Sequence, residues 1–138
     1  MLTELRQYQT HTAQTATPGQ LVVMLYDGFL RFAAQARAAL GRDDVGEAGV
    51  RLTKAQAIVT ELRATLDMTQ GEVAENLASL YGYVGERLTA ARLDRDVAEI
   101  DEAVRHMAEL RAAWAQIASS PKPQTQRRGP VLGVNLAG

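Results

Sequence analysis

The two histidines, His11 and His106, are the side chains of this sequence best suited to metal binding or phosphotransfer. A di-iron site inside a helical bundle uses Glu-x-x-His pairs, in which a glutamate stands three residues before the histidine. The residue three before His106 is Ala103, and the chain has no cysteine to supply another ligand. We therefore expect neither a metal nor any other cofactor.

Phosphotransfer is the second chemistry that a histidine on a helix suggests. The residues after His106 read Met-Ala-Glu-Leu, without the lysine and glycine that we expect in the next turn of a phosphotransfer helix. We interpret His106 as a residue at the boundary of an apolar helix face. The sequence also lacks a nucleophile matched to a base and a glycine-rich phosphate loop, so we predict that the protein is not an enzyme. A metal or phosphotransfer bundle stays an alternative that elemental analysis and a phosphorylation assay test.

The composition favours one folded domain. The chain has 138 residues, of which 46% are apolar, and its 15 basic and 16 acidic side chains give a formal charge of -1. That balance argues against nucleic-acid binding, which needs a basic patch. The longest apolar run is the six residues 21–26, whereas a membrane-spanning helix needs about 20. With a polar N-terminus that lacks the apolar core of a secretory signal, we expect a cytoplasmic protein with no membrane insertion.

Four helix starts are marked by capping residues. Three capping-box pairs are Thr17 with Gln20, Asp44 with Glu47, and Thr69 with Glu72. In such a pair the side chain of each residue accepts the backbone N–H of the other. A fourth helix begins at Asp94 or at Asp96, and the latter pairs with Glu99. The candidate caps at 17, 44, 69 and 94 are spaced by 27, 25 and 25 residues. This spacing predicts four helices of similar length joined by short loops.

The first helix is expected over residues 18–40, with Gly41 as its left-handed C-cap. Its apolar residues are too many for one core-facing stripe, which is about 100° wide. Either the helix is buried on several sides, or its surplus apolar surface waits for a partner. We attribute Gly28 to close packing on a neighbouring helix. The surplus positions are Val22, Met24, Tyr26 and Leu30.

The later helices each carry one apolar stripe with the spacing of three and four residues that is typical of helices. Ile58 is expected beside the stripe of the second helix, and Tyr81 and Tyr83 off the centre of the third. The three stripes are Ala48, Leu52, Ala55, Val59, Leu62 and Leu66; then Val73, Leu77, Leu80, Val84, Leu88 and Ala91; then Val97, Ile100, Val104, Met107, Leu110, Trp114 and Ile117.

These patterns predict an all-α protein, an antiparallel up-down four-helix bundle. We expect the bundle to span residues 17–118, between a flexible N-terminal segment, 1–16, and a flexible, disordered tail, 119–138. An alternative for the N-terminal segment is that Leu5 and Tyr8 dock it onto the bundle. From the residues alone the functional expectation is a small helical binding protein.

A resemblance to a known family extends that expectation. Residues 17–28, Thr-Pro-Gly-Gln-Leu-Val-Val-Met-Leu-Tyr-Asp-Gly, resemble the motif small-Pro-x-x-Leu-x-x-Met-Leu-Tyr-Asp/Glu-Gly of the flagellar secretion chaperones called FliS. Further similarity lies in Lys-Ala-Gln-x-Ile-x-x-x-Leu at 54–62 with Leu66-Asp67, in Ala-Glu-Asn-Leu-x-x-Leu-Tyr at 74–81, and in Leu-Arg-x-x-Trp at 110–114. The likeness covers residues 8 to 114.

The resemblance implies a cytoplasmic export chaperone. Such a protein binds the disordered C-terminal segment of flagellin in hydrophobic grooves between helices, prevents premature polymerisation and aids delivery to the flagellar type III export apparatus. Other flagellar regulatory or export proteins are further possible partners, and a generic adaptor bundle without flagellin specificity is the alternative. Leu5 and Tyr8 are expected to cover the client groove when it is empty. The expected groove residues are Leu21, Val22, Met24, Leu25, Tyr26, Leu30, Ile58, Leu77 and Tyr81.

Overall fold

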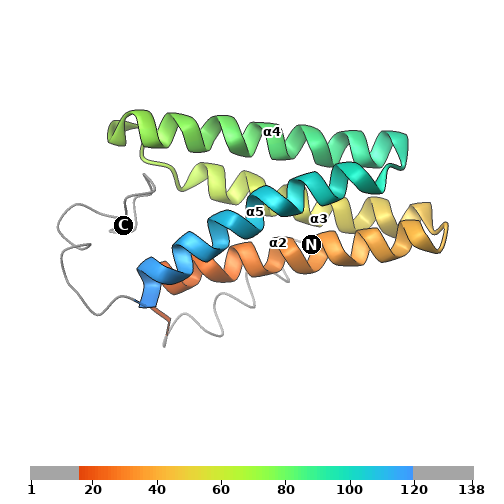
Figure 1. Cartoon of the computed structure of the whole chain (residues 1–138), viewed down its shortest axis with the longest axis horizontal. Coiled ribbons are helices and arrows are strands. Elements are labelled where there is room, and N and C mark those ends of the chain that lie inside the picture. Colours follow the sequence, from red (N-terminus) through yellow and green to blue (C-terminus); the bar gives the residue numbers. More distant parts are fainter. Residues whose placement is uncertain (1–15, 120–138) are drawn as a thin grey trace.

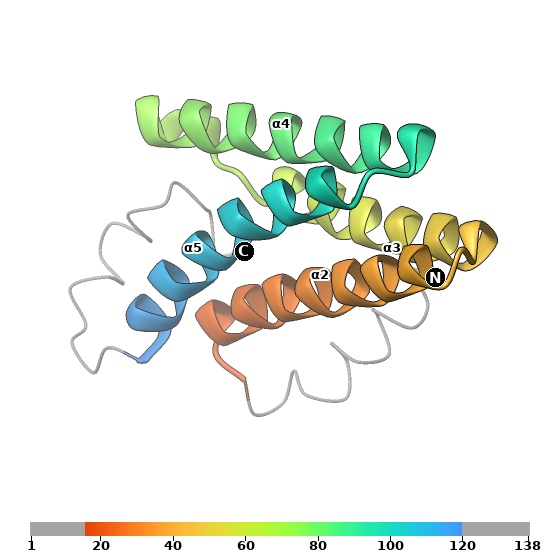
Figure 2. The ribbon, with the colours of Figure 1, turned by 45° about the vertical axis from the view of Figure 1, so that its right-hand side comes forward.

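The computed structural model describes residues 16–119, which form a ring of four α-helices around one core. The helices are α2 (Pro18–Gly41), α3 (Val45–Ala64), α4 (Glu72–Asp94) and α5 (Val97–Ser119), with a short 3-10 helix, η1 (Met68–Gln70), before α4. Short turns make successive helices antiparallel, and both α2 and α4 pack between α3 and α5 (Figures 1 and 2). The predicted antiparallel up-down bundle is confirmed. Within residues 16–119, none of the helices combines the length and the apolar character that crossing a membrane requires.

The start of α2 is the predicted capping box. The backbone N–H of Gln20 donates to Thr17 Oγ1 at 3.1 Å, and the N–H of Thr17 donates to Gln20 Oε1 at 2.9 Å. The predicted end of this helix is wrong, because Gly41 is its last helical residue and not a left-handed cap. The left-handed conformation falls on Asp43, with a φ of 59°. A short polar side chain tolerates that conformation, so the turn does not depend on glycine.

Asp44 caps α3, as predicted, by accepting the N–H of Glu47 at 3.1 Å. The reciprocal half of the predicted capping box is absent, because the Glu47 carboxylate accepts a hydrogen bond from Arg51 Nε instead. Arg51 lies one turn further along the same helix face, where an i, i+4 ion pair competes with the cap.

The predicted start of α4 at Thr69 is wrong. Thr69 belongs to η1, and its N–H donates to the side chain of Asp67, which opens the turn two residues earlier. The N-cap of α4 is Gly71, which has a φ of 71° and no side chain with which to cap. Glycine suits this position because the chain reverses there with a positive φ.

For α5 the structure selects Asp96 rather than Asp94. Asp96 accepts the N–H of Ala98 at 2.9 Å, whereas Asp94 is the last residue of α4. Glu99 does not complete a capping box, because its carboxylate accepts from Arg87 Nη1 at 2.6 Å. The helix continues to Ser119, the first residue of the predicted tail.

The core follows the predicted stripes, with three differences. Ile58 and Tyr81, expected beside the stripes, are buried with exposed fractions of 0% and 1%, whereas Val73 is 40% exposed. Ile58 reaches the core because Gly28 leaves room for it: a Cβ on Gly28 would lie 3.0 Å from Ile58 Cδ1. This confirms the close packing expected at Gly28. Tyr81 is buried because its hydroxyl meets that of Tyr26 at 2.5 Å inside the core.

Candidate functional site

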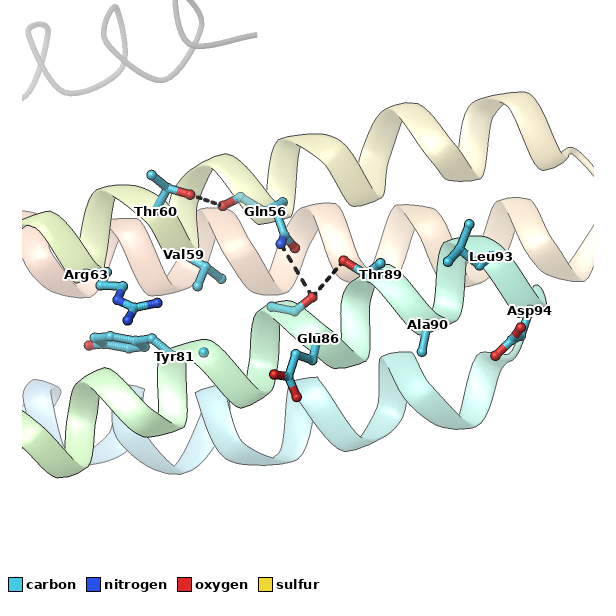
Figure 3. A pocket seen from close by; sticks show the side chains of 12 residues that line it. Gln56, Val59, Thr60, Arg63, Tyr81, Glu86, Thr89, Ala90, Leu93 and Asp94 are labelled. Atoms are coloured by element: carbon cyan, nitrogen blue, oxygen red, sulfur yellow. Dashed lines mark hydrogen bonds between the residues drawn. The ribbon is translucent and has the colours of Figure 1, made fainter.

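A hollow with a volume of about 630 Å³ lies between α3 and α4 and is called here the α3–α4 groove (Figure 3). The groove runs along the antiparallel helices α3 and α4 and is open to solvent, so it is not an enclosed cavity. A smaller hollow of about 230 Å³ shares Gln56 and Thr89 with it and extends it past Leu52 and Leu88. The groove is lined by Gln56, Val59, Thr60, Arg63, Tyr81, Gly82, Gly85, Glu86, Thr89, Ala90, Leu93 and Asp94.

Two glycines shape the wall that α4 contributes to the groove. A Cβ on Gly82 would have only one atom nearby, Arg63 Nη1 at 3.8 Å, so a methyl group there would occupy open groove space. A Cβ on Gly85 would meet the end of the Gln56 side chain at 3.2 Å. The missing side chain of Gly82 therefore lets another backbone approach α4 closely, whereas the space beside Gly85 is filled by Gln56.

The polar atoms of the groove surround the carbonyl of Gly85. Gln56 Nε2 donates to this oxygen at 3.4 Å, and the Thr89 hydroxyl donates to it at 3.1 Å (Figure 3). Gln56 Oε1 is buried and has no hydrogen-bond partner within residues 16–119. Buried polar atoms are normally paired, so this oxygen is an exception in the wall of the groove.

The chemistry of the groove is that of a binding surface. Its apolar members include Val59, Ala90 and Leu93, and Leu93 is 70% exposed. The charged lining residues are Arg63, Glu86 and Asp94. Across residues 16–119 no group of three metal-ligating side chains comes together. Exposed leucine with small polar side chains fits an amphipathic peptide helix.

The predicted groove residues do not form one surface. The buried ones lie in the core: Val22, Leu25, Tyr26, Ile58, Leu77 and Tyr81. Leu21, Met24 and Leu30 are half-buried on α2. Tyr81 is the one predicted residue that also lines the α3–α4 groove. Leu5 and Tyr8 lie outside the described residues, as does His11.

Tyr81 connects the groove to the core through its hydrogen bond with Tyr26. Burial raises the pKa of both phenols above the ordinary value, so both stay neutral at physiological pH. A neutral, hydrogen-bonded pair supports the groove wall from behind at no cost of buried charge.

Five residues of the candidate groove were not predicted from the sequence: Gln56, Thr60, Gly82, Gly85 and Thr89. Their signal was the pair of glycines three residues apart inside the third predicted helix, where each glycine costs about 1 kcal/mol relative to alanine. Such a cost in a helix interior indicates that the space above the backbone is used. The facing residues on α3, Gln56 and Thr60, had no signal of their own, because the spacing of residues along one helix does not show which helix packs against it.

His106 belongs to a different feature, a polar network on the α4–α5 face. Its ring lies edge-on to Tyr83, with the ring centroids 5.5 Å apart, and its Nε2 is 3.3 Å from Glu102 Oε2. Glu102 also accepts the Tyr83 hydroxyl at 2.9 Å and Arg105 Nη2 at 2.7 Å. The hydrogen bonds from Arg105 and Tyr83 lower the pKa of Glu102 to about 2. These contacts brace α4 against α5 and agree with the interpretation of His106 as a boundary residue.

A family model described as "Flagellar protein FliS" matches residues 1–121, which is most of the chain. The chain belongs to the FliS family. It is 33% identical over 124 residues to the flagellar secretion chaperone FliS of Bacillus subtilis (strain 168), covering 90% of this chain and 92% of that protein. It is 40% identical over 114 residues to the FliS chaperone of Salmonella typhimurium (strain LT2), covering 81% and 83%. The corresponding protein of Escherichia coli (strain K12) is 38% identical over 111 residues, covering 78% and 80%.

Membership of the FliS family confirms the resemblance seen in the α2 motif. The family is one of flagellar secretion chaperones and not of enzymes, as the sequence predicted. The match to the FliS model ends at residue 121, so residues 122–138 lie beyond what the family model accounts for.

Proposed function

We propose that this FliS-family chain is a cytoplasmic export chaperone that binds the disordered C-terminal segment of flagellin as a helix in the α3–α4 groove. Binding there would cover the client surface that drives polymerisation and would hold it for the flagellar type III export apparatus. The observation that carries this proposal is the groove itself, whose α4 wall is open at Gly82. Other flagellar regulatory or export proteins are secondary candidate partners.

The energetics of a helix in this groove are favourable. A disordered client that folds on binding loses about 2–5 kcal/mol of the gross interaction energy to ordering. Each large apolar side chain that it buries returns about 1.5–3 kcal/mol. The exposed Leu93 and the open space at Gly82 give such anchors room in the groove. Three or four buried client side chains would contribute more than the ordering cost.

The residues that the sequence predicted for the client groove take different roles in this proposal. Leu21, Met24 and Leu30 are half-buried and offer a second contact region to a client that extends beyond the groove. The six predicted residues that lie in the core support these surfaces from within. Leu5 and Tyr8 remain the proposed cover of exposed apolar surface when the client is absent. Deleting residues 1–16 should then increase the binding of a hydrophobic dye, and an unchanged dye signal would contradict the cover.

The decisive experiment is titration calorimetry of the chain against a C-terminal flagellin peptide from the same organism. We expect one-to-one binding with a large negative heat-capacity change, because apolar surface is buried as the client folds. No heat at two temperatures, with both components intact, would instead favour a generic adaptor bundle.

Two glycine substitutions locate the client. Gly82→Ala and Gly49→Ala each replace a helix-interior glycine, so each should stabilise the bundle by up to about 1 kcal/mol. The Gly82 methyl enters the groove, whereas Gly49 lies outside its lining and a Cβ there has no atom within 4 Å. We expect Gly82→Ala to weaken client binding at least threefold and Gly49→Ala to leave it unchanged. Equal client affinity for the two variants would place the client elsewhere.

A further inference from the structure

The chain beyond α5 has a composition unlike the bundle. Residues 120–138 contain three basic side chains, Lys122, Arg127 and Arg128, and no acidic one. They continue into the apolar sequence Val-Leu-Gly-Val-Asn-Leu at 131–136. The FliS family model stops at residue 121, so the family match gives this segment no role.

The bundle has the opposite charge. Residues 16–119 carry eleven basic and fifteen acidic side chains, a formal charge of -4 against +3 for the basic side chains of residues 120–138. The groove itself is lined by two acidic residues, Glu86 and Asp94, and one basic residue, Arg63, while Arg92 lines the adjoining smaller hollow. Charges of opposite sign attract over about 10 Å at 0.1 M salt, which favours the return of residues 120–138 to the bundle surface.

The segment is long enough to reach the groove. The C-terminal end of α5 lies at the same end of the bundle as the start of α4 (Figure 1). The eleven residues 120–130 span up to about 36–40 Å when extended, which exceeds the length of about 34 Å of a 23-residue helix such as α4. Residues 131–136 are therefore within reach of the whole α3–α4 groove.

The apolar hexamer also matches the groove in length and chemistry. Six extended residues measure about 20 Å, and the α4 lining from Tyr81 to Leu93 measures about 18 Å at the helical rise. Val59, Ala90 and Leu93 give the groove an apolar lining, of which Leu93, at 70% exposed, offers the most surface to the hexamer.

We propose that residues 131–136 occupy the α3–α4 groove of their own chain when no client is bound, and that the client must displace them. This inference rests on the proposed function for the identity of the competitor. A tethered segment acts at an effective concentration of the order of millimolar. It therefore covers the groove in the free protein and weakens apparent client affinity without excluding a tight client.

The test compares the full chain with a chain truncated after Ser119, which retains all four helices and the core described for residues 16–119. In NMR spectra we expect the amide signals of Gly82, Gly85 and Thr89 to shift on truncation, and that of Ala38, at the far end of α2, to stay unchanged. A full-length variant, Val131→Ser with Leu132→Ser and Leu136→Ser, keeps all tail charges and should shift the same amides. The shifts should not depend on protein concentration, whereas concentration dependence would indicate docking between copies and overturn the proposal.

Calorimetry then separates this inference from the proposed function. We expect the truncated chain and the serine variant to bind the flagellin peptide at least threefold more tightly than the full chain. Equal affinities with unchanged groove amides would overturn the docked segment and leave the chaperone function intact. Shifted groove amides with no peptide binding by any form would support the docked segment and contradict the proposed client.

Discussion

The hydroxyls of Tyr26 and Tyr81 illustrate how one polar contact decides the place of a residue. The sequence analysis counted Tyr26 as surplus apolar surface on the first helix and placed Tyr81 off the stripe of the third. Both side chains are buried because each hydroxyl satisfies the other across the core, at 2.5 Å. The spacing of apolar residues takes account only of the apolar part of a tyrosine. It therefore cannot predict a hydrogen bond to a partner 55 residues away in the chain.

Replacing one tyrosine of this pair leaves the other without its partner. We expect Tyr26→Phe to lower the free energy of unfolding by about 1–3 kcal/mol, because the buried Tyr81 hydroxyl then has no hydrogen bond. The double variant, Tyr26→Phe with Tyr81→Phe, removes both hydroxyls and should cost clearly less than the sum of the single variants. Urea denaturation measures all three, and an additive double variant would show that the contact is not energetically coupled.

The first residue of each helix depends on which nearby side chain accepts the free backbone N–H groups of the first turn. Thr17 and Asp44 cap as predicted, because each side chain accepts the backbone N–H of the residue three positions later. Thr69 does not, because Asp67 already accepts its N–H and opens a 3-10 turn. The existence of each helix is therefore predictable from the apolar stripes, whereas its first residue depends on competition within a few residues.

Two threonine substitutions compare a capping side chain with a non-capping one. Thr17→Ala removes the acceptor of the Gln20 N–H and should lower the free energy of unfolding by about 1 kcal/mol. Thr69→Ala removes an exposed hydroxyl that caps no helix, and its effect should stay within about 0.5 kcal/mol. Chemical denaturation of both variants gives the comparison, and equal losses would mean that the Thr17 cap adds nothing specific.

For the whole molecule, the arrangement of the helices is fixed by contacts that join distant parts of the sequence. Arg111 binds both carboxylate oxygens of Asp27, and Arg37 does the same with Asp101, so two ion pairs tie α5 to α2. These partners are 84 and 64 residues apart. Helical spacing identifies only partners three or four residues away, so neither ion pair is predictable from the sequence pattern.

The same limit explains which parts of the candidate site were predictable. The α2 motif identified the family, and the capping residues with the three stripes of the later helices predicted the bundle, since all are local patterns. The α3–α4 groove was not predicted, because it needs the pairing of Gln56 on one helix with Gly85 on another. A groove is made by side chains that are small or missing, and their effect appears only when two helices are placed side by side.

Alkaline pH should unfold the whole bundle through its buried phenols. Burial raises the pKa of Tyr26 and Tyr81 in the folded state, whereas the unfolded chain ionises near pH 10. The stabilisation is therefore complete below about pH 10 and is lost above it, at up to about 1.4 kcal/mol per pH unit for each phenol. Urea denaturation from pH 9 to 11 measures the slope.

A matched control uses the tyrosine on the surface. Tyr83→Phe should keep most of the loss of stability above pH 10, because Tyr83 is exposed, although its hydrogen bond to Glu102 raises its pKa too. The Tyr26→Phe, Tyr81→Phe double variant should remove most of that loss. The same slope in the double variant would assign the alkaline transition to other groups.

Because α2 pairs with α5, the core of the bundle can close only when the last helix has been synthesised. The ribosome makes α2 first and α5 last, yet these two helices lie side by side and share two ion pairs. The nascent chain can assemble α2 with α3 and then add α4, but the α5-facing side of α2, with Asp27 and Arg37, stays open until translation is nearly finished. A chaperone of this topology has no closed core while it is being translated, so its own newly made helices need protection from contacts with neighbouring chains until the last helix arrives.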